Sequence, residues 1–355
     1  MNISIIGSVG VPACYGGFES LVENLLDYTP ADIKYTIYCC SKMYEKKIDT
    51  YKNANLRYLN INANGISSIL YDIISLWKAR KSDVILILGV SGCMFLPLFR
   101  IFYKGRLITN IDGLEWKRQK WNILAKAVLL QSEKAAIKYS DIIIGDNKGI
   151  TDYVLKTYNK QASLIAYGAD HAVPVNKIQF MNDYPFAKAK YAVTVCRIEP
   201  ENNIDHILKV FDQTKSTLPI IIVGNWKTSL YGLELFSKYS NKENIILFDS
   251  IYNIERINYI RSNASLYIHG HSAGGTNPSL VEAMNLSLSI AAFDCVYNRE
   301  TTEGKALYWK TEEDLCSIIS EINITQNGSV MKDIASKNYT WQSIAQKYNQ
   351  LFRIQ

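Results

Sequence analysis

The sequence lacks the marks of several common protein classes. No two of its seven cysteines form a Cys-x-x-Cys pair and their number is odd, which disfavours a disulfide framework or a thiolate zinc site. Only His269 and His271 of the four histidines lie close together, no ligand spacing surrounds them, and no Asp-x-Asp motif is present. We therefore expect reduced cysteines, a cytoplasmic location and no bound metal.

Long hydrophobic runs are also missing. The longest, residues 84–99, is interrupted by two glycines and a proline and is too short to cross a bilayer. A buried strand, a loop and a short helix explain it better. No basic leader precedes the first strand pattern, so no secretory signal is expected. There is also no low-complexity tract and no repeat of 20–50 residues.

The composition is that of a globular protein. Hydrophobic residues make up 48% and charged residues 20% of 355 residues, a length that suits two domains. The net charge of +6 is modest and is compatible with phosphorylated substrates, an anionic membrane surface or nucleic acid.

Short apolar strands alternate with helical patterns along the chain, which predicts parallel sheets with right-handed crossovers. In the first half we expect strands at residues 3–6, 35–38, 56–60, 84–88, 106–111, 142–144 and 163–165. In the second half we expect them at residues 192–196, 220–223, 245–248, 266–268 and 289–292. The rhythm is lost between them, around two prolines.

This pattern predicts an α/β protein with two Rossmann-like, doubly wound domains facing a central cleft. The expected parts are residues 1–172, a linker at 173–190, a second domain at 191–335 and a helix at 336–355 that crosses back to the first domain. Ligand sites of such domains lie at the carboxyl ends of the strands.

The most informative stretch is residues 269–284, which reads as a strand end, a glycine-rich loop and a helix. Asn277 is a helix-capping residue and Pro278 takes the favoured first helical position. The start of the helix would present free N–H groups and a positive dipole end to a phosphate. Glu282 follows about one turn later and could bind a hydroxyl beside that phosphate. The alternative is an ordinary capped helix.

A second glycine-rich loop, residues 7–17, follows the first strand. Its spacing is not Gly-x-Gly-x-x-Gly and no acidic residue ends the second strand, so NAD binding is poorly supported. Backbone N–H groups at Gly16 and Gly17 suit a diphosphate or a sugar better. A sharp turn into a helix explains the loop equally well.

Charged residues follow other strand ends. Arg197 could neutralise a diphosphate, or could form an ion pair with Glu199 or Glu201. Asp112 and Glu115 could bind sugar hydroxyls or act as a base, although Asp112 also belongs to a common turn signal. Basic and aromatic residues at 95–106 and 117–121 suit anionic headgroups, or simply form a solvated basic surface.

Taken together, these landmarks resemble a known family. Tyr15-Gly16-Gly17-Phe18-Glu19, Asn110 to Trp121, Arg197 to Asn203, Val223-Gly224-Asn225-Trp226 and His269 to Met284 occur in the order seen in the rhamnosyltransferase-like branch of family 4 retaining glycosyltransferases, which have the GT-B fold. The resemblance spans nearly the whole chain.

The resemblance implies transfer of a hexose, first of all L-rhamnose from dTDP-rhamnose, with retention and without a metal or cofactor. The acceptor would be a polyprenyl-diphosphate-linked saccharide at the inner face of the membrane, in bacterial surface polysaccharide assembly; nucleic acid would not be a partner. It implies Arg197, Asp112 and Glu115 as catalytic residues. The donor would contact Gly16, Gly17, Asn225, Lys227, Ile251, His271, Gly274, Gly275, Thr276, Asn277, Ser279, Leu280 and Glu282.

Two positions depart from the broader family. The first glutamate of its Glu-x7-Glu motif is replaced by Gly274, and its diphosphate lysine falls near Asn203, with Lys227 as a candidate substitute. Two other functions stay open: a UDP-sugar 2-epimerase and a non-catalytic protein that binds nucleotide-sugars or glycans.

Overall fold

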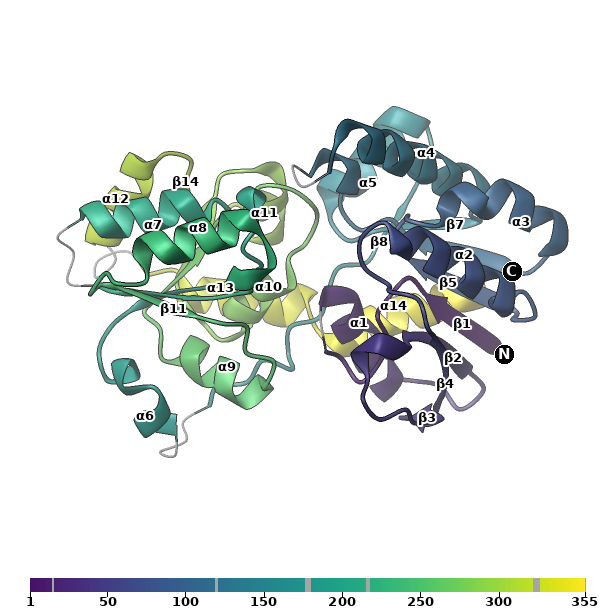
Figure 1. The fold of residues 1–355 in the computed structure, drawn as a ribbon, viewed down its shortest axis with the longest axis horizontal. Coiled ribbons are helices and arrows are strands. Elements are labelled where there is room, and N and C mark those ends of the chain that lie inside the picture. Colours follow the sequence, from purple (N-terminus) through teal and green to yellow (C-terminus); the bar gives the residue numbers. More distant parts are fainter. Residues whose placement is uncertain (15, 119–120, 176–179, 215–217, 322–325, 355) are drawn as a thin grey trace. The chain divides into compact units, whose positions relative to one another are not determined.

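The computed structural model describes residues 1–14, 16–118, 121–175, 180–214, 218–321 and 326–354. Tyr15 of the N-terminal motif, Gln119 and Lys120 of the basic segment, and residues 176–179 of the expected linker lie outside these ranges. The chain divides into two compact units: unit 1 comprises Met1–Tyr167 and Trp341–Gln355, and unit 2 comprises Gly168–Thr340 (Figure 1).

Unit 1 is built on an eight-stranded sheet that is parallel except for its first pair. Its strands lie in the order β3 (Thr50–Tyr51), β4 (Ala54–Leu59), β2 (Lys34–Cys40), β1 (Asn2–Ile6), β5 (Val84–Leu88), β6 (Arg106–Asn110), β7 (Ile142–Gly145) and β8 (Ser163–Leu164). The chain reverses its direction across the sheet between β1 and β5, and this switch point opens a crevice at the carboxyl edge.

The helices of unit 1 are α1 (Gly17–Asp27), α2 (Ser67–Ala79), α3 (Leu96–Phe102), α4 (Ile123–Tyr139), α5 (Lys148–Tyr158) and α14 (Trp341–Arg353). Both α1 and α14 bury residues in one core with β1, β2 and β5. Because parallel crossovers are right-handed, α2 to α5 cover the opposite face.

Unit 2 has a six-stranded parallel sheet. The order is β11 (Ile245–Phe248), β10 (Ile220–Val223), β9 (Ala192–Val195), β12 (Leu266–His269), β13 (Ile290–Phe293) and β14 (Leu307–Trp309). Its helices are α6 (Phe180–Asp183), α7 (Ile204–Gln213), α8 (Leu230–Tyr239), α9 (Ile254–Ser262), α10 (Pro278–Asn285), α11 (Val296–Thr301), α12 (Glu312–Glu321) and α13 (Gly328–Asn338). The switch point of this sheet lies between β9 and β12.

The final helix belongs to unit 1 although unit 2 precedes it in the chain. Trp341, Ile344, Tyr348 and Phe352 are all buried in the unit 1 core. The Tyr348 hydroxyl accepts a hydrogen bond of 3.0 Å from Asn110 Nδ2 at the end of β6. Figure 1 shows α14 in yellow beside the early, purple part of the chain.

Most of the expected strands and helices are present, with shifts of one or two residues at their ends. The expectations missed the short strands β3 and β14 and the helices α5, α11 and α13. The segment expected to be a plain linker also contains α6 and the 3-10 turn Pro185–Lys188. All seven cysteines are free, as expected.

Candidate active site

The candidate site of unit 2 lies at its switch point. Arg197 follows β9, and the glycine-rich loop follows the neighbouring strand β12. Several hydrogen bonds hold these segments together: Ser272 N and Ser272 Oγ both donate to Glu201 O at 2.9 Å, and Asn203 Nδ2 donates to Gly270 O at 2.7 Å. The two predicted segments therefore lie side by side.

Glycine is required within this loop for two different reasons. A Cβ at Gly270 would collide with the carbonyl of Asn202, so only glycine allows the two segments to approach this closely. Gly274 has a φ of +107°, a conformation that other residues rarely adopt.

His271 is held in a defined orientation. Its Nδ1 lies 2.8 Å from Asn202 Oδ1, while Asn202 Nδ2 donates to the Arg197 carbonyl at 2.7 Å. Because the amide nitrogen of Asn202 is the donor in that second bond, its oxygen accepts a hydrogen bond from His271 Nδ1. The Nε2 atom of His271 therefore faces the Gly274 side of the loop, where a Gly274 Cβ would come within 3.2 Å of it.

His269, the last residue of β12, is buried. It is 3% exposed and stacks on Tyr267 with ring centroids 6.0 Å apart. Burial lowers the pKa of His269 to about 3, so its ring is neutral.

The start of α10 corrects one expectation. The predicted cap is confirmed, because Asn277 Oδ1 accepts from Ser279 N at 3.0 Å. Leu280 N donates to Asn277 O at 3.0 Å, and its side chain is fully buried. We had expected the N–H groups at the start of this helix to be free for a phosphate. Those of Ser279 and Leu280 are instead already hydrogen-bonded within the protein.

Glu282 is the centre of a buried charge cluster and not a surface residue. Its Oε2 lies 2.6 Å from Arg261 Nη1, and its Oε1 lies 3.1 Å from His171 Nε2. Burial alone would raise the pKa of Glu282, but Arg261 and the hydrogen bond from His171 outweigh that effect and lower it to about 2. The carboxylate stays ionised at neutral pH.

Arg197 adopts part of the structural alternative. Its Nη2 lies 3.9 Å from Glu199 Oε2, and 42% of its side chain is exposed. At that distance the ion pair is long.

Asn225, Lys227 and Ile251 lie beyond the ends of the adjacent strands β10 and β11. Asn225 Oδ1 accepts from Ile198 N at 2.8 Å, and its Nδ2 donates to Thr228 Oγ1 at 2.8 Å, so this amide fixes the loop that carries Arg197. Lys227 forms an exposed ion pair of 2.9 Å with Asp249. Ile251 is half-buried.

The glycine-rich loop of unit 1 lies at the switch point beside β5. A Cβ at Gly7 would collide with the Leu88 carbonyl, and Gly7 and Gly10 both have positive φ. Glu19, which is buried on α1, accepts a hydrogen bond of 2.6 Å from Val9 N. Gly16 stands at the N-cap position of α1 and Gly17 is its first residue.

Asp112 and Glu115 share one partner, Arg118. Glu115 Oε2 lies 2.7 Å from Arg118 Nε, and Glu115 Oε1 accepts from Trp121 Nε1 at 3.1 Å. Asp112 Oδ2 is 3.9 Å from Arg118 Nη2. We had expected Arg118 to belong to a basic surface. It is only 7% exposed and belongs to this cluster instead. Asp112 is the more exposed of the two acids and has a φ of +58°.

Two protein-family models match the chain, and the boundary between them lies close to the boundary between Tyr167 and Gly168. Residues 1–170 match a domain of unknown function, DUF1972, and residues 176–306 match the model described as glycosyl transferases group 1. Residues 176–306 are thus similar to a group 1 glycosyltransferase domain. This segment contains Arg197, the glycine-rich loop and Glu282. No curated protein sequence matches the chain.

Solved structures confirm the GT-B architecture of two Rossmann-like domains. The chain is similar to sucrose-phosphate synthase from Thermosynechococcus elongatus, with a TM-score of 0.82, 15% identity and coverage of 99% of this chain and 98% of that one. It is also similar to Anabaena Alr3699/HepE in complex with UDP-glucose, with a TM-score of 0.77, 11% identity and coverage of 99% and 98%. A trehalose-6-phosphate structure from E. coli bound with UDP-2-fluoro glucose matches with a TM-score of 0.72, 10% identity and coverage of 100% and 99%.

Sequence reasoning missed four residues of these clusters. Arg261 lies on α9, where no motif marks it, and we had expected His171 to be an ordinary core or loop histidine. Asn202 and Arg118 stand inside recognised segments but were given no role. Buried ion pairs between separate elements leave no pattern in a single sequence.

The described residues contain neither a cluster of metal ligands nor a helix suited to crossing a membrane. Among them, no group of three or more His, Cys, Asp and Glu side chains is placed to hold a metal ion. No helix in this part of the chain combines the length and the apolar character that crossing a bilayer requires.

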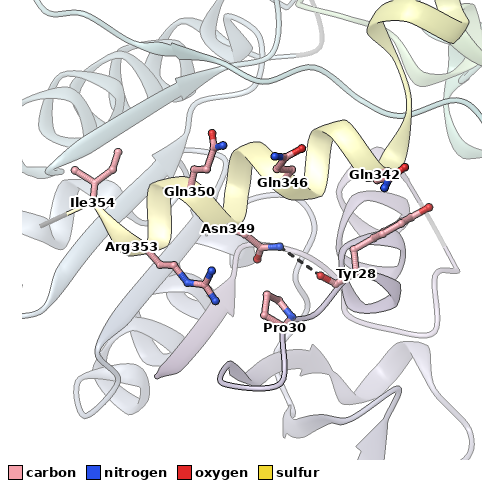
Figure 2. A pocket seen from close by; sticks show the side chains of 8 residues that line it. All are labelled: Tyr28, Pro30, Gln342, Gln346, Asn349, Gln350, Arg353 and Ile354. Carbon is pink, nitrogen blue, oxygen red and sulfur yellow. Dashed lines mark hydrogen bonds between the residues drawn. The ribbon is translucent and has the colours of Figure 1, made fainter.

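A hollow of about 760 Å³ lies elsewhere in unit 1, between α14 and the loop after α1 (Figure 2). It is lined by Tyr28, Pro30, Gln342, Gln346, Asn349, Gln350, Arg353 and Ile354. Asn349 Nδ2 donates to Tyr28 O across it at 3.3 Å. None of the predicted site residues lines this hollow, and it lies away from the carboxyl edge, so we do not assign the donor to it.

Proposed function

We propose that this protein is a retaining, metal-independent hexosyltransferase. It moves a sugar from a nucleotide-sugar, with dTDP-L-rhamnose as the first candidate, to a polyprenyl-diphosphate-linked saccharide in bacterial surface polysaccharide assembly. The observation that carries the proposal is the group 1 match at residues 176–306, with Arg197 and the glycine-rich loop adjacent at the switch point of that domain.

The donor diphosphate would lie against Arg197 and the loop of residues 270–277. Negative charge develops on the departing diphosphate, and a guanidinium stabilises it through charge-assisted hydrogen bonds. With 42% of its side chain exposed, Arg197 is accessible to a ligand. The same loop contains His271, Gly274, Gly275 and Thr276.

Glu282 would bind the ribose, and Ile251 would lie near the base. Although Arg261 and His171 each engage one oxygen of Glu282, a carboxylate oxygen has a second lone pair that can accept from a hydroxyl. Arg261 and His171 then orient the carboxylate. Lys227 is a weaker candidate for the diphosphate because Asp249 already pairs with it.

In unit 1 the proposed contacts are the backbone at Gly16 and Gly17 and the side chains of Asp112 and Glu115. Asp112 is the more exposed of the two acids, so it is the better candidate to contact a sugar hydroxyl. In the transfer the bond between the anomeric carbon and the diphosphate oxygen breaks, a bond from that carbon to the acceptor oxygen forms, and the proton of the acceptor hydroxyl passes to the departing diphosphate. We propose a cytoplasmic protein that works at the inner face of the membrane, with no part for nucleic acid.

Ligand-induced stabilisation tests the donor class. A thermal-shift panel of dTDP, UDP, GDP, ADP and NAD(H), with and without Mg²⁺, should show a selective increase in Tm with one nucleoside diphosphate and no dependence on the metal. UDP belongs in the panel because UDP-sugars are bound in two of the similar structures. Stabilisation by NAD(H) alone would overturn the proposal.

Product analysis separates the remaining alternatives. A UDP-sugar 2-epimerase would convert the donor itself, and a non-catalytic binding protein would stabilise with a nucleotide but release no nucleoside diphosphate. A transferase releases nucleoside diphosphate and hands the sugar to an acceptor.

A further inference from the structure

Two helices of unit 1 expose apolar stripes. On α2 the stripe runs through Ile66, at its N-cap, then Leu70 and Trp77, and on α3 it runs through Leu98, Ile101 and Phe102. The spacing of three, four or seven residues keeps each set on one side of its helix. Exposure ranges from 40% for Trp77 to 78% for Ile66, so these side chains face solvent.

The two stripes meet at the C-terminal ends of α2 and α3. The rings of Trp77 and Phe102 are in edge contact, with centroids 5.5 Å apart and planes at 79°. We call Trp77, Leu98, Ile101 and Phe102 the Trp77–Phe102 patch. An apolar patch of this kind on a protein surface marks a contact with a partner or a membrane.

Basic residues stand at the C-terminal ends of both helices, where the two stripes meet. Lys78, Arg80, Lys81 and Lys104 are exposed and form no ion pair with the described residues, and the Arg80 guanidinium lies 4.9 Å from the centroid of the Trp77 ring. Every residue of α2, α3 and the adjoining α4 is described, and the two acidic residues of these helices, Asp72 and Glu133, are buried. Nearby Asp83 and Asp141 are engaged by Asn2 N and by Arg100.

We propose that the Trp77–Phe102 patch docks unit 1 on an anionic phospholipid surface. Tryptophan and phenylalanine enter the boundary between headgroups and acyl chains, and long basic side chains reach phosphate groups around them. An apolar centre with cations that form no ion pair matches an anionic lipid surface, which is fluid and adapts to the patch. A protein partner would match less well, because its acidic and apolar groups would have to be fixed in a complementary shape.

Membrane docking rests on the proposed function, because an enzyme whose acceptor is linked to the membrane must reach the membrane surface. Vesicle binding needs no donor nucleotide, however. Failure to bind vesicles would leave donor binding untouched, and failure to bind a donor would leave vesicle binding untouched.

Flotation of the full-length protein with vesicles tests the proposal. We expect binding to vesicles of phosphatidylcholine with phosphatidylglycerol, little binding to phosphatidylcholine alone, and weaker binding as salt rises. The charge reversal Lys81→Glu/Lys104→Glu should reduce the partition coefficient about tenfold or more. Ile101→Ser/Phe102→Ser should reduce it by about tenfold through lost apolar contact.

Matched controls separate the patch from general charge and hydrophobicity. Lys46→Glu/Lys47→Glu makes the same charge change on an exposed segment after β2, and Leu230→Ser/Leu233→Ser removes exposed leucines from α8. Both should bind vesicles within about twofold of wild type. Circular dichroism checks that all four variants are folded.

Quenching by brominated lipid locates the contact. Bromophosphatidylglycerol should quench part of the tryptophan emission, and Trp77→Phe should bind vesicles but lose most of that quenching. Equal binding by the patch variants and the controls would overturn the proposal. A wild-type protein that does not bind anionic vesicles would also overturn it. This includes the case in which the wild type forms a dimer and the patch variants do not.

Discussion

At the scale of single residues, Glu282 forms a buried ion pair with Arg261 and a hydrogen bond with His171, and these contacts lower its pKa. Arg197, Glu282 and the capping Asn277 were predictable because each stands in a motif. The contacts of Glu282 with Arg261 and His171 were not predictable, because these two residues precede Glu282 by 21 and 111 positions in the chain. Such pairings depend on packing, which a motif does not encode.

Glu282→Gln should expose this cluster through its pH dependence. The folded pKa of Glu282 is about 2, below its ordinary value of 4.5, so its stabilising effect is complete above pH 4.5 and is lost as the pH falls towards 2. The difference in unfolding free energy between wild type and variant should therefore shrink by about 3 kcal/mol from pH 5 to pH 2. Urea unfolding at several pH values measures it.

The control for this series is Glu234→Gln, which changes an exposed glutamate on α8. Its stability should differ little from wild type at every pH. A wild-type advantage over Glu282→Gln that is constant across the range would contradict the account of the ion pair.

Arg197→Ala and Lys227→Ala should differ sharply in turnover. Loss of the Arg197 guanidinium removes charge stabilisation of the leaving diphosphate and should lower kcat by about 10²- to 10³-fold. Lys227 is 71% exposed and pairs with Asp249 in solvent, so its removal should cost only a few-fold. Steady-state release of nucleoside diphosphate measures both, with Tm as the check on folding. The reverse order would assign the diphosphate to Lys227.

At the scale of elements, buried apolar runs made the sheets predictable. The strands β5 and β10 have the expected bounds because five and four consecutive apolar residues mark a strand buried on both faces. The strands β3 and β14 have only two and three residues, too few for a pattern. The helices α5 and α13 mix polar and apolar residues, and their place in the fold depends on the sheet they cover.

Gly270→Ala should be more harmful than Gly304→Ala. At Gly270 a Cβ meets the backbone carbonyl of Asn202, and the loops that carry Arg197 and His271 must separate. At Gly304 nothing lies within 4 Å and only the positive φ of +70° is strained, which costs about 1–2 kcal/mol.

Chemical denaturation and nucleotide-induced thermal shift measure the two effects separately. Gly270→Ala should lose nucleotide stabilisation, and Gly304→Ala should keep it despite a lower Tm. Unchanged nucleotide binding in a folded Gly270→Ala variant would contradict the role given to the loop contact.

At the scale of the whole molecule, the two units differ in how the chain closes them. The ends of unit 2 meet, because Ala169 N donates to Tyr339 O at 2.7 Å. Unit 1 is completed only by α14, whose Ile344, Tyr348 and Phe352 fill its core. The crossing of the last helix was predictable in outline from its apolar face, but its contact with Asn110 at the carboxyl edge of β6 was not.

Fragments of the chain should reflect this difference. Residues 168–340 should fold alone with a cooperative transition, whereas residues 1–167 should not, because removal of α14 exposes fully buried side chains. Joining residues 341–355 to residues 1–167 through a flexible linker should restore cooperative unfolding. Circular dichroism during urea titration reports the outcome, and a cooperative 1–167 fragment would contradict it.

We propose above all that the segment matching the group 1 model, residues 176–306, catalyses sugar transfer from a nucleotide-sugar. The most direct measurement is release of nucleoside diphosphate from a panel of nucleotide-sugars, including dTDP-rhamnose and UDP-glucose, by wild type and by Arg197→Ala, without added metal. The account predicts turnover of one donor by wild type, with the anomeric configuration retained in the product by NMR, and a loss of about 10²-fold or more in the variant. Equal rates for the two proteins, or no turnover of any donor that binds, would contradict it.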